Sequence, residues 1–220
     1  MQDDERDLEP ARHWPSLPQN GGVEREDWNR KHCEAGPLFG TEPNRFLVAE
    51  VAGLEPGSAL DLACGAGRNA VWLAEQGWVV TAADFSDVAL ENARRLADER
   101  GVEVEWVQAD MREWQSASRD VDLVVVLYLQ LPRHERRAVL GHAADALAPG
   151  GTLLVVGHDP QNLNGGHGGP KDPEVLFTAQ DVVAELPGLE VEKAERVLRP
   201  VVTDDGEVQA IDALVRARRS

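Results

Sequence analysis

The 220-residue sequence contains few cysteines and few positive charges. Its two cysteines, Cys33 and Cys64, are too few for a disulfide framework or a cysteine-rich metal cluster, which favours a reducing compartment. Lys and Arg number 22 against 39 Asp and Glu, so the net charge is −17. Nucleic acids and anionic membranes attract proteins through Lys and Arg, and the charge therefore disfavours both as partners. A strongly acidic proteome would explain the same charge without any partner.

Long apolar runs and targeting signals are also missing. The longest strongly apolar run, Leu123–Leu129, is much shorter than the roughly 20 residues that cross a bilayer. The sequence starts with MQDDERDLEP, which is acidic where a secretory signal peptide needs a basic and then an apolar stretch. These features predict a soluble, cytoplasmic protein that has no membrane partner.

The remaining pattern predicts an acidic tail followed by one domain. Residues 1–22 carry many charges and no hydrophobic period, and we interpret them as flexible. Residues 23–220 suit a single α/β domain, in which residues 23–55 form an N-terminal helical lid and residues 56–220 form the core.

Within the core, strand and helix patterns alternate. The expected strands are 58–62, 78–83, 102–106, 122–127 and 152–157, and the expected helices are 68–76, 86–100, 132–148 and 178–186. Two final strands, 189–198 and 209–216, flank a turn at 204–206 and predict an antiparallel hairpin. Such alternation predicts an α/β, Rossmann-like three-layer sandwich with a mainly parallel sheet.

Three signals lie at the ends of successive expected strands. The segment DLACGAG, residues 61–67, joins a strand to a helix, and its glycines allow a tight turn and a close ligand approach. Asp84 follows 19 residues after Gly65, where an acid can accept hydrogen bonds from ribose hydroxyls. Asp110 follows the third expected strand, and its carboxylate can accept a hydrogen bond from an adenine amino group. Each signal alone also fits an ordinary turn or cap, but together they predict one adenosine-shaped site at the carboxyl edge of the sheet.

The runs ALDLACGAGRNAVWLAEQGWVVTAADFS, VQADM and DALAPGGTLLVV resemble the motifs of class I methyltransferases that use S-adenosylmethionine (SAM). The resemblance covers about residues 40–218 and implies strand order 3-2-1-4-5-7-6, SAM as cofactor and S-adenosylhomocysteine (SAH) as product. FGTEPNRFL followed by CGAGRNAVWLA resembles the small tellurite-resistance and thiopurine-type methyltransferases, which implies a small acceptor: a thiol, a chalcogen oxyanion, or a small phenol or acid. The Asn/Asp-Pro-Pro-Tyr motif of nucleic-acid and protein amide methylases is absent, which disfavours base methylation.

The same resemblance implies which residues hold the cofactor. They are Asp61, Ala63, Cys64, Gly65, Gly67, Asp84, Phe85, Asp110, Met111 and Leu127. Of these, Cys64 is interpreted as a packing residue of the loop and not as a nucleophile.

Topology suggests the acceptor site. Its candidate residues are Trp28, Phe39, Arg68, Tyr128, His158 and His167, with Tyr128 and His158 as the catalytic candidates. Each also has an ordinary interpretation: a strand-end His158 can be a hydrogen-bonded structural residue, His167 and Arg68 can be solvated, and Trp28 can be a hydrophobic anchor.

Other hypotheses remain open at this stage. The glycine-rich segment 165–169 predicts a mobile flap that orders with ligand. His158, Asp159 and His167 lie near one another in sequence, but their spacing is weak evidence and no metal is predicted. The alternatives to methyl transfer are an NAD(P)-dependent oxidoreductase and a SAM-binding protein that transfers nothing. The expected assembly is a monomer or a homodimer.

Overall fold

The computed structural model describes residues 24–35, 40–203 and 206–220. The predicted tail at residues 1–22, the acceptor candidate Phe39 and most of the expected hairpin turn at 204–206 lie outside these residues.

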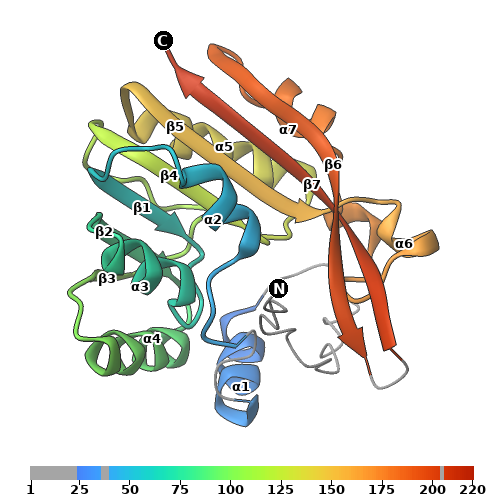
Figure 1. The fold of residues 1–220 in the computed structure, drawn as a ribbon, viewed down its shortest axis with the longest axis horizontal. Coiled ribbons are helices and arrows are strands. Elements are labelled where there is room, and N and C mark those ends of the chain that lie inside the picture. The colour runs from blue at the N-terminus through green and yellow to red at the C-terminus, as the bar shows by residue number, and fades with distance from the viewer. Residues whose placement is uncertain (1–23, 36–39, 204–205) are drawn as a thin grey trace, which may run out of the picture.

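A seven-stranded sheet runs through the middle of the molecule in the order β3-β2-β1-β4-β5-β7-β6 (Figure 1). The first five strands run parallel, whereas β7 lies antiparallel between β5 and β6. The strands are β1 (Ser58–Leu62), β2 (Val79–Asp84), β3 (Glu105–Gln108), β4 (Val121–Leu127), β5 (Leu147–His158), β6 (Leu189–Thr203) and β7 (Gly206–Arg219). The predicted fold class, strand order and terminal hairpin are therefore confirmed.

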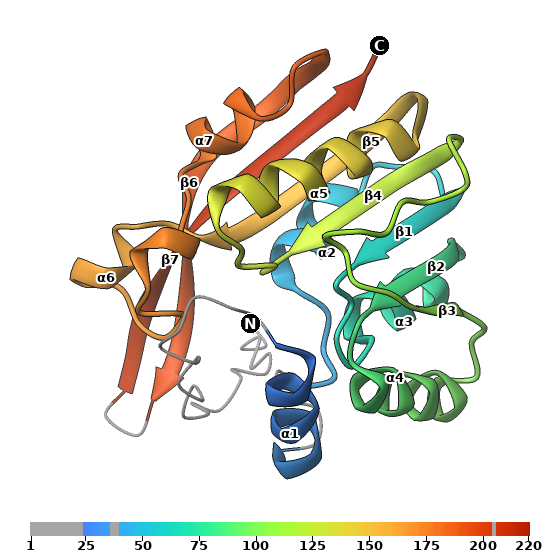
Figure 2. The same cartoon turned by 180° about the vertical axis from the view of Figure 1, so that it is seen from behind.

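Helices cover both faces of this sheet, as the predicted three layers require. One face carries α2 (Arg45–Val51), α3 (Arg68–Glu75) and α4 (Asp87–Arg100), and the other carries α5 (Arg133–Ala146) and α7 (Ala179–Ala184) (Figures 1 and 2). Each face has its own buried apolar cluster against the sheet. The remaining helices are α1 (Arg25–Ala35), which contacts α4, and the short α6 (Asn162–Gly165) and η1 (Pro173–Val175).

The helix ends follow from the local sequence. Ser86 caps α4 by accepting a hydrogen bond from the amide of Ala89, and Gly101 ends the helix in a left-handed conformation. Thr178 and Asp181 form the expected capping box at the start of α7.

Several strand ends differ from the prediction. β3 begins at Glu105 instead of at residue 102, because Gly101 first turns the chain and pairing with β2 starts only at Thr81. β6 and β7 are longer than predicted and pair almost to their tips. Since β5 ends where His158 pairs with Asp212, residues 198–203 and 206–211 pair only with each other. We call them the hairpin extension, and Figure 1 shows it continuing past the end of β5.

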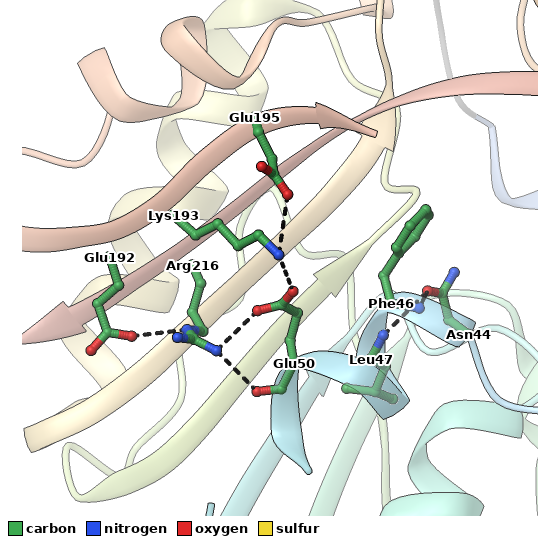
Figure 3. Close-up of polar contacts among 8 residues, drawn as sticks. All are labelled: Asn44, Phe46, Leu47, Glu50, Glu192, Lys193, Glu195 and Arg216. Carbon is green, nitrogen blue, oxygen red and sulfur yellow. Dashed lines mark hydrogen bonds and ion pairs between the residues drawn. The ribbon is translucent and has the colours of Figure 1, made fainter. Parts of the chain in front are cut away.

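An ion-pair cluster around the buried Glu50 joins α2 to strands β6 and β7 (Figure 3). The Glu50 side chain, 8% exposed, receives Lys193 Nζ at 2.7 Å and Arg216 Nη1 at 2.9 Å. Lys193 also contacts Glu195 at 3.1 Å, and Arg216 contacts Glu192 at 2.8 Å. The hydrogen bond with Glu50, and then that with Glu195, raises the pKa of Lys193. The cluster ties the N-terminal part of the domain to its C-terminal strands.

Glu50→Gln is expected to lower the free energy of unfolding by about 1–3 kcal/mol, because two cations lose a largely buried carboxylate. Urea unfolding measures the change. Glu195→Gln is the matched control, since it contacts the same lysine from a side chain that is 49% exposed and should change stability by less than about 1 kcal/mol. Equal losses in the two variants would contradict the prediction.

Candidate functional site

The glycine turn after β1 combines open space with close packing. Gly65 has φ +55° and a Cβ added there would meet nothing within 4 Å. Gly67 has φ +82°, and a Cβ there would lie 2.7 Å from Ala93 and 2.8 Å from the Trp106 ring. Gly67 is thus required by helix packing, whereas Gly65 leaves the backbone accessible to a ligand.

Asp84, at the end of β2, stabilises this turn by accepting a hydrogen bond from its backbone. Its Oδ2 accepts from the amide of Gly65 at 2.9 Å, and its Oδ1 accepts from the amide of Ser86 at 2.9 Å. The backbone carbonyl of Asp84 accepts from the amide of Ala109 at 3.0 Å, which brings in the segment after β3. The three predicted strand-end signals therefore meet at one edge of the sheet.

Two buried carboxyl groups lie at this edge. Burial raises the pKa of Asp84. Burial, and then the charge of Asp84, raises the pKa of Asp61 to about 7, against the opposing charge of Arg68. Asp61 is 1% exposed, and its Oδ2 has no hydrogen-bond partner among the described residues. An ionised carboxylate buried in this way is costly unless a donor or cation joins it.

The segment after β3 places Asp110 and Met111 as a corner beside Asp84. Both carboxylate oxygens of Asp110 accept from Arg112 Nε at 3.0 Å, and the hydrogen bonds from Arg112 lower the pKa of Asp110. Met111 is buried and Phe85 is half-buried, with the Phe85 carbonyl oxygen accepting from Gln108 Nε2 at 3.4 Å. Asp110 thus already has a cationic partner.

A second cluster of polar side chains lies at the end of β4. Leu127 is buried, and the next residue, Tyr128, has φ +59°, which is unusual for a tyrosine. The Tyr128 hydroxyl donates to Asp212 Oδ2 at 2.7 Å. Burial, followed by the charge of Asp212, raises the pKa of Tyr128 far above its ordinary value. This hydroxyl therefore stays protonated at neutral pH.

His158, at the end of β5, joins the same group. Its Nδ1 lies 2.9 Å from Asp212 Oδ1, and its ring lies 5.0 Å from the Tyr128 ring. The side chain is 1% exposed, and a Cβ on Gly169 would lie 2.9 Å from the imidazole. The two catalytic candidates are thus brought together, but both face Asp212 and the glycine-rich loop covers His158.

The remaining acceptor candidates are spread around this edge. Arg68 Nη1 donates to the carbonyl oxygen of Glu42 at 3.3 Å. Trp28 lies in α1, and Lys31 Nζ is 4.6 Å from the centre of its ring. His167 is exposed, and its amide donates to the Gln209 carbonyl in the hairpin extension. Cys64 is buried, and burial raises the pKa of its thiol.

Sequence reasoning missed Asp212 and Arg199. Arg199 Nε lies 2.9 Å from Asp212 Oδ2 and 3.1 Å from the Tyr128 hydroxyl oxygen. Asp212 stands alone in the apolar run AIDALV, and a single acid inside a buried strand is the signal that would have indicated it. Arg199 carries no comparable local signal, because its role depends on how the hairpin crosses the sheet end.

Over the described part of the chain, the structure contains no group of three His, Cys, Asp or Glu residues arranged to hold a metal ion. None of its described helices is both long and apolar enough to cross a bilayer.

Comparison with known sequences finds similarity to methyltransferases over about half of the chain. Residues 59–151 match the family described as a methyltransferase domain. The demethylmenaquinone methyltransferase of Thermus thermophilus is 36% identical over 107 residues, which are 48% of this chain and 49% of the relative. The ribosomal RNA small subunit methyltransferase C of Alcanivorax borkumensis is 31% identical over 110 residues, 46% of this chain and 32% of the relative. The chain thus spans half or less of the length of these relatives.

Solved structures share the fold over most of the chain. TehB from Haemophilus influenzae is 17% identical and superposes with a TM-score of 0.69 over 90% of this chain and 68% of its own. The N-methyltransferase NodS from Bradyrhizobium japonicum, in complex with SAH, is 19% identical, with a TM-score of 0.67 over 89% of this chain and 98% of its own.

The glycine turn, the ring of acids at the sheet edge, the strand order and the matched family agree with the predicted resemblance. Residues 59–151 are therefore similar to a methyltransferase domain, and the chain shares its fold with solved structures that include the SAH-bound NodS.

Proposed function

We propose that this protein transfers a methyl group from SAM to a small-molecule acceptor. The observation that carries the proposal is the carboxylate of Asp61, whose Oδ2 is buried without a partner among the described residues beside the open Gly65 turn. A cationic or hydrogen-bond-donating ligand group would satisfy this oxygen, and the amino group of SAM has that chemistry.

The resemblance implies which residues would hold the cofactor. Asp61 and the backbone of residues 63–67 would hold the methionyl part and the ribose edge, and Asp84 would accept hydrogen bonds from the ribose hydroxyls. Asp110 and Met111 would hold the adenine, with Phe85 beside it, and the backbone at Leu127 would face the methionyl amino group.

The chemistry asks little of the protein beyond alignment. When bound, SAM supplies a sulfonium whose methyl group is already activated for in-line displacement. The side chains at the ends of β4 and β5 then have to orient the acceptor and exclude water, an effect that can be worth roughly 7–11 kcal/mol. Tyr128 stays protonated, and because its one O–H donates to Asp212, its ring serves as a wall of the acceptor site. His158 acts as a base only if the 165–169 loop moves away from its ring.

The small-molecule class rests on charge and on the N-terminal segment. A net charge of −17 disfavours a nucleic-acid acceptor. Asn29 of α1 donates to Asp87 at 2.7 Å and accepts from the Ser86 hydroxyl at 2.7 Å, next to Asp84. We propose that residues 23–55 form a lid over the site. The free cysteines support a cytoplasmic location.

The test is cofactor binding followed by turnover. Calorimetry with SAM and with reduced nicotinamide cofactors should show binding of SAM alone. SAH release with a panel of thiols, phenols, tellurite and selenite then measures transfer. Binding of a nicotinamide instead of SAM would overturn the proposal. SAM binding with no SAH released from any acceptor class would favour a binding protein without transferase activity.

Asp61→Asn is expected to stabilise the protein without ligand while weakening SAM binding at least about tenfold. The pKa of Asp61 in the folded chain, about 7, lies above its usual value of 3.8, so the unfolded chain ionises first as the pH rises. Ionisation therefore costs stability between about pH 4 and 7, and the full penalty remains above pH 7. The asparagine removes this penalty, and a pKa difference of about 3 corresponds to about 4 kcal/mol at pH 8.

Urea unfolding of the two proteins between pH 4 and 8.5, without ligand, checks this expectation. The stability gain of Asp61→Asn should grow with pH up to about 8 and be small near pH 4. A gain that does not vary with pH would show that ionisation of Asp61 is not its cause. Asp122→Asn, at the opposite edge of the sheet, is a comparison of opposite sign: hydrogen bonds from Ser58 lower the pKa of Asp122, so this variant should lose stability as the pH rises.

A further inference from the structure

We propose that Arg199 binds an anionic group of the methyl acceptor, so that the preferred acceptors are small molecules that carry a carboxylate beside the methylated nucleophile. This inference rests on the proposed methyl transfer and adds a substrate class to it. Arg199 is not among the predicted site residues.

The neighbours of Arg199 fix its guanidinium group in place. Its Nε donates to Asp212 Oδ2 at 2.9 Å and to the Tyr128 hydroxyl oxygen at 3.1 Å. Its Cζ lies 5.5 Å from the centre of the Tyr128 ring. Asp212 is 0% exposed and is itself held by His158. A guanidinium held at Nε and over a ring keeps a defined plane, which reduces the entropy lost on binding a ligand.

The outer nitrogens of this group remain available. Within the described residues, neither Nη atom of Arg199 makes a hydrogen bond or ion pair, and neither is buried. The side chain retains 23% exposure. Two parallel N–H groups in a fixed fork match a carboxylate in a bidentate arrangement.

The position of Arg199 indicates that its two Nη atoms lie on the acceptor side of the proposed site. Arg199 lies in the hairpin extension, yet its side chain reaches Tyr128, the residue that follows β4 at the carboxyl edge. Ligands of open α/β sheets bind at that edge, and the methionyl end of the cofactor is expected beside the neighbouring Leu127. The surface has a net charge of −17 and would repel an anion, so a local cation is needed to hold one.

Paired acceptors test the proposal. The probes are 3-mercaptopropionate against 2-mercaptoethanol, and 3,4-dihydroxybenzoate against catechol. For each pair, the ratio of kcat/KM for the carboxylated over the neutral acceptor is measured in wild type, Arg199→Gln and Arg199→Lys. Comparing ratios between proteins cancels the intrinsic reactivity of each nucleophile.

We expect wild type to favour the carboxylated member, and Arg199→Gln to lower the ratio about 10- to 100-fold, as for one charge-assisted hydrogen-bonded pair. Arg199→Lys should keep part of the preference, since it retains the charge and loses the fork. Arg218→Gln removes a guanidinium of the same hairpin at the opposite sheet edge, where it donates to Gly150, and should leave the ratio unchanged.

Calorimetric binding of 3-mercaptopropionate to the SAH complex gives a readout independent of turnover. It should weaken by a similar factor in Arg199→Gln. Equal ratios and equal binding in wild type and Arg199→Gln would overturn the inference while leaving methyl transfer intact. Failure of the wild type to bind SAM or SAH would instead refute the proposed function. If Arg199→Gln does not fold, an Arg199→Lys protein with wild-type ratios and wild-type binding overturns the inference.

Discussion

Asp84→Asn is expected to raise the dissociation constant of SAM by at least about 100-fold. The carboxylate now accepts from the amides of Gly65 and Ser86, one on each oxygen. An asparagine offers one acceptor and turns a donor toward the other amide, so the glycine turn loses its brace. The charged acceptor proposed for the ribose hydroxyls is lost at the same time. Hydrogen bonds to charged groups are worth about 1.5–3 kcal/mol each. Losing the two proposed from the ribose hydroxyls therefore costs more than about 2.7 kcal/mol, which corresponds to a 100-fold change in the dissociation constant.

Calorimetric titration with SAM measures this loss, and far-ultraviolet circular dichroism confirms that the variant is folded. Asp122→Asn is a matched control, because Asp122 also accepts a backbone hydrogen bond, from Ser58 at 2.8 Å, but at the amino edge of the sheet. Its SAM affinity should equal that of the wild type. An Asp84→Asn protein that binds SAM as tightly as the control would show that this edge is not the cofactor site.

Asp212→Asn is expected to lower the free energy of unfolding by about 3–5 kcal/mol and the Tm by about 10 °C. Asp212 is fully buried and receives His158, Tyr128 and Arg199, all within 2.9 Å. The asparagine keeps the shape, but it removes the carboxylate charge beside the Arg199 guanidinium and turns an N–H donor toward donors. Its one oxygen can accept on one side only, so either His158 or the pair of Tyr128 and Arg199 would lack an acceptor.

The pH dependence of this loss follows from the direction of the pKa change. Burial alone raises the pKa of Asp212, but the hydrogen bond from His158 and the charge of Arg199 outweigh burial and lower it. A lowered pKa stabilises the fold above the usual carboxyl pKa, and the contribution disappears as the pH falls through the folded-state value. Unfolding experiments should therefore show the difference at pH 7 shrinking below about pH 4. Glu207→Gln, exposed on the same strand, is the control, and an equal loss in that variant would contradict the network's role.

Much of the fold and of the cofactor edge could be predicted from local sequence. The DLACGAG turn, Ser86 as an N-cap and the capping box of Thr178 are short-range patterns, because backbone geometry and cap hydrogen bonds involve only a few neighbouring residues. Strand ends were less predictable. The start of β3 depends on where β2 offers a partner, and the length of the hairpin extension depends on β6 and β7 pairing with each other beyond β5.

The contacts of Tyr128 and His158 show which part of the site the sequence left undecided. Tyr128 and His158 were correctly expected at neighbouring strand ends, but their shared partner Asp212 and the guanidinium of Arg199 come from the last two strands, 71 or more residues away from Tyr128. Only tertiary packing brings them together, because β7 inserts between β5 and β6 and carries Asp212 next to His158.

The sequence by itself determined the layered α/β fold, the similarity of residues 59–151 to a methyltransferase domain, and the line of glycine and acid residues at one edge of the sheet. The tertiary structure decided that Asp61 keeps a buried, partnerless carboxylate oxygen among the described residues, that His158 lies under Gly169, and that Arg199 turns its outer nitrogens outward. The reason is physical: turns and caps are set by chain neighbours, whereas burial, charge pairing and pKa depend on residues that meet only after the sheet has formed.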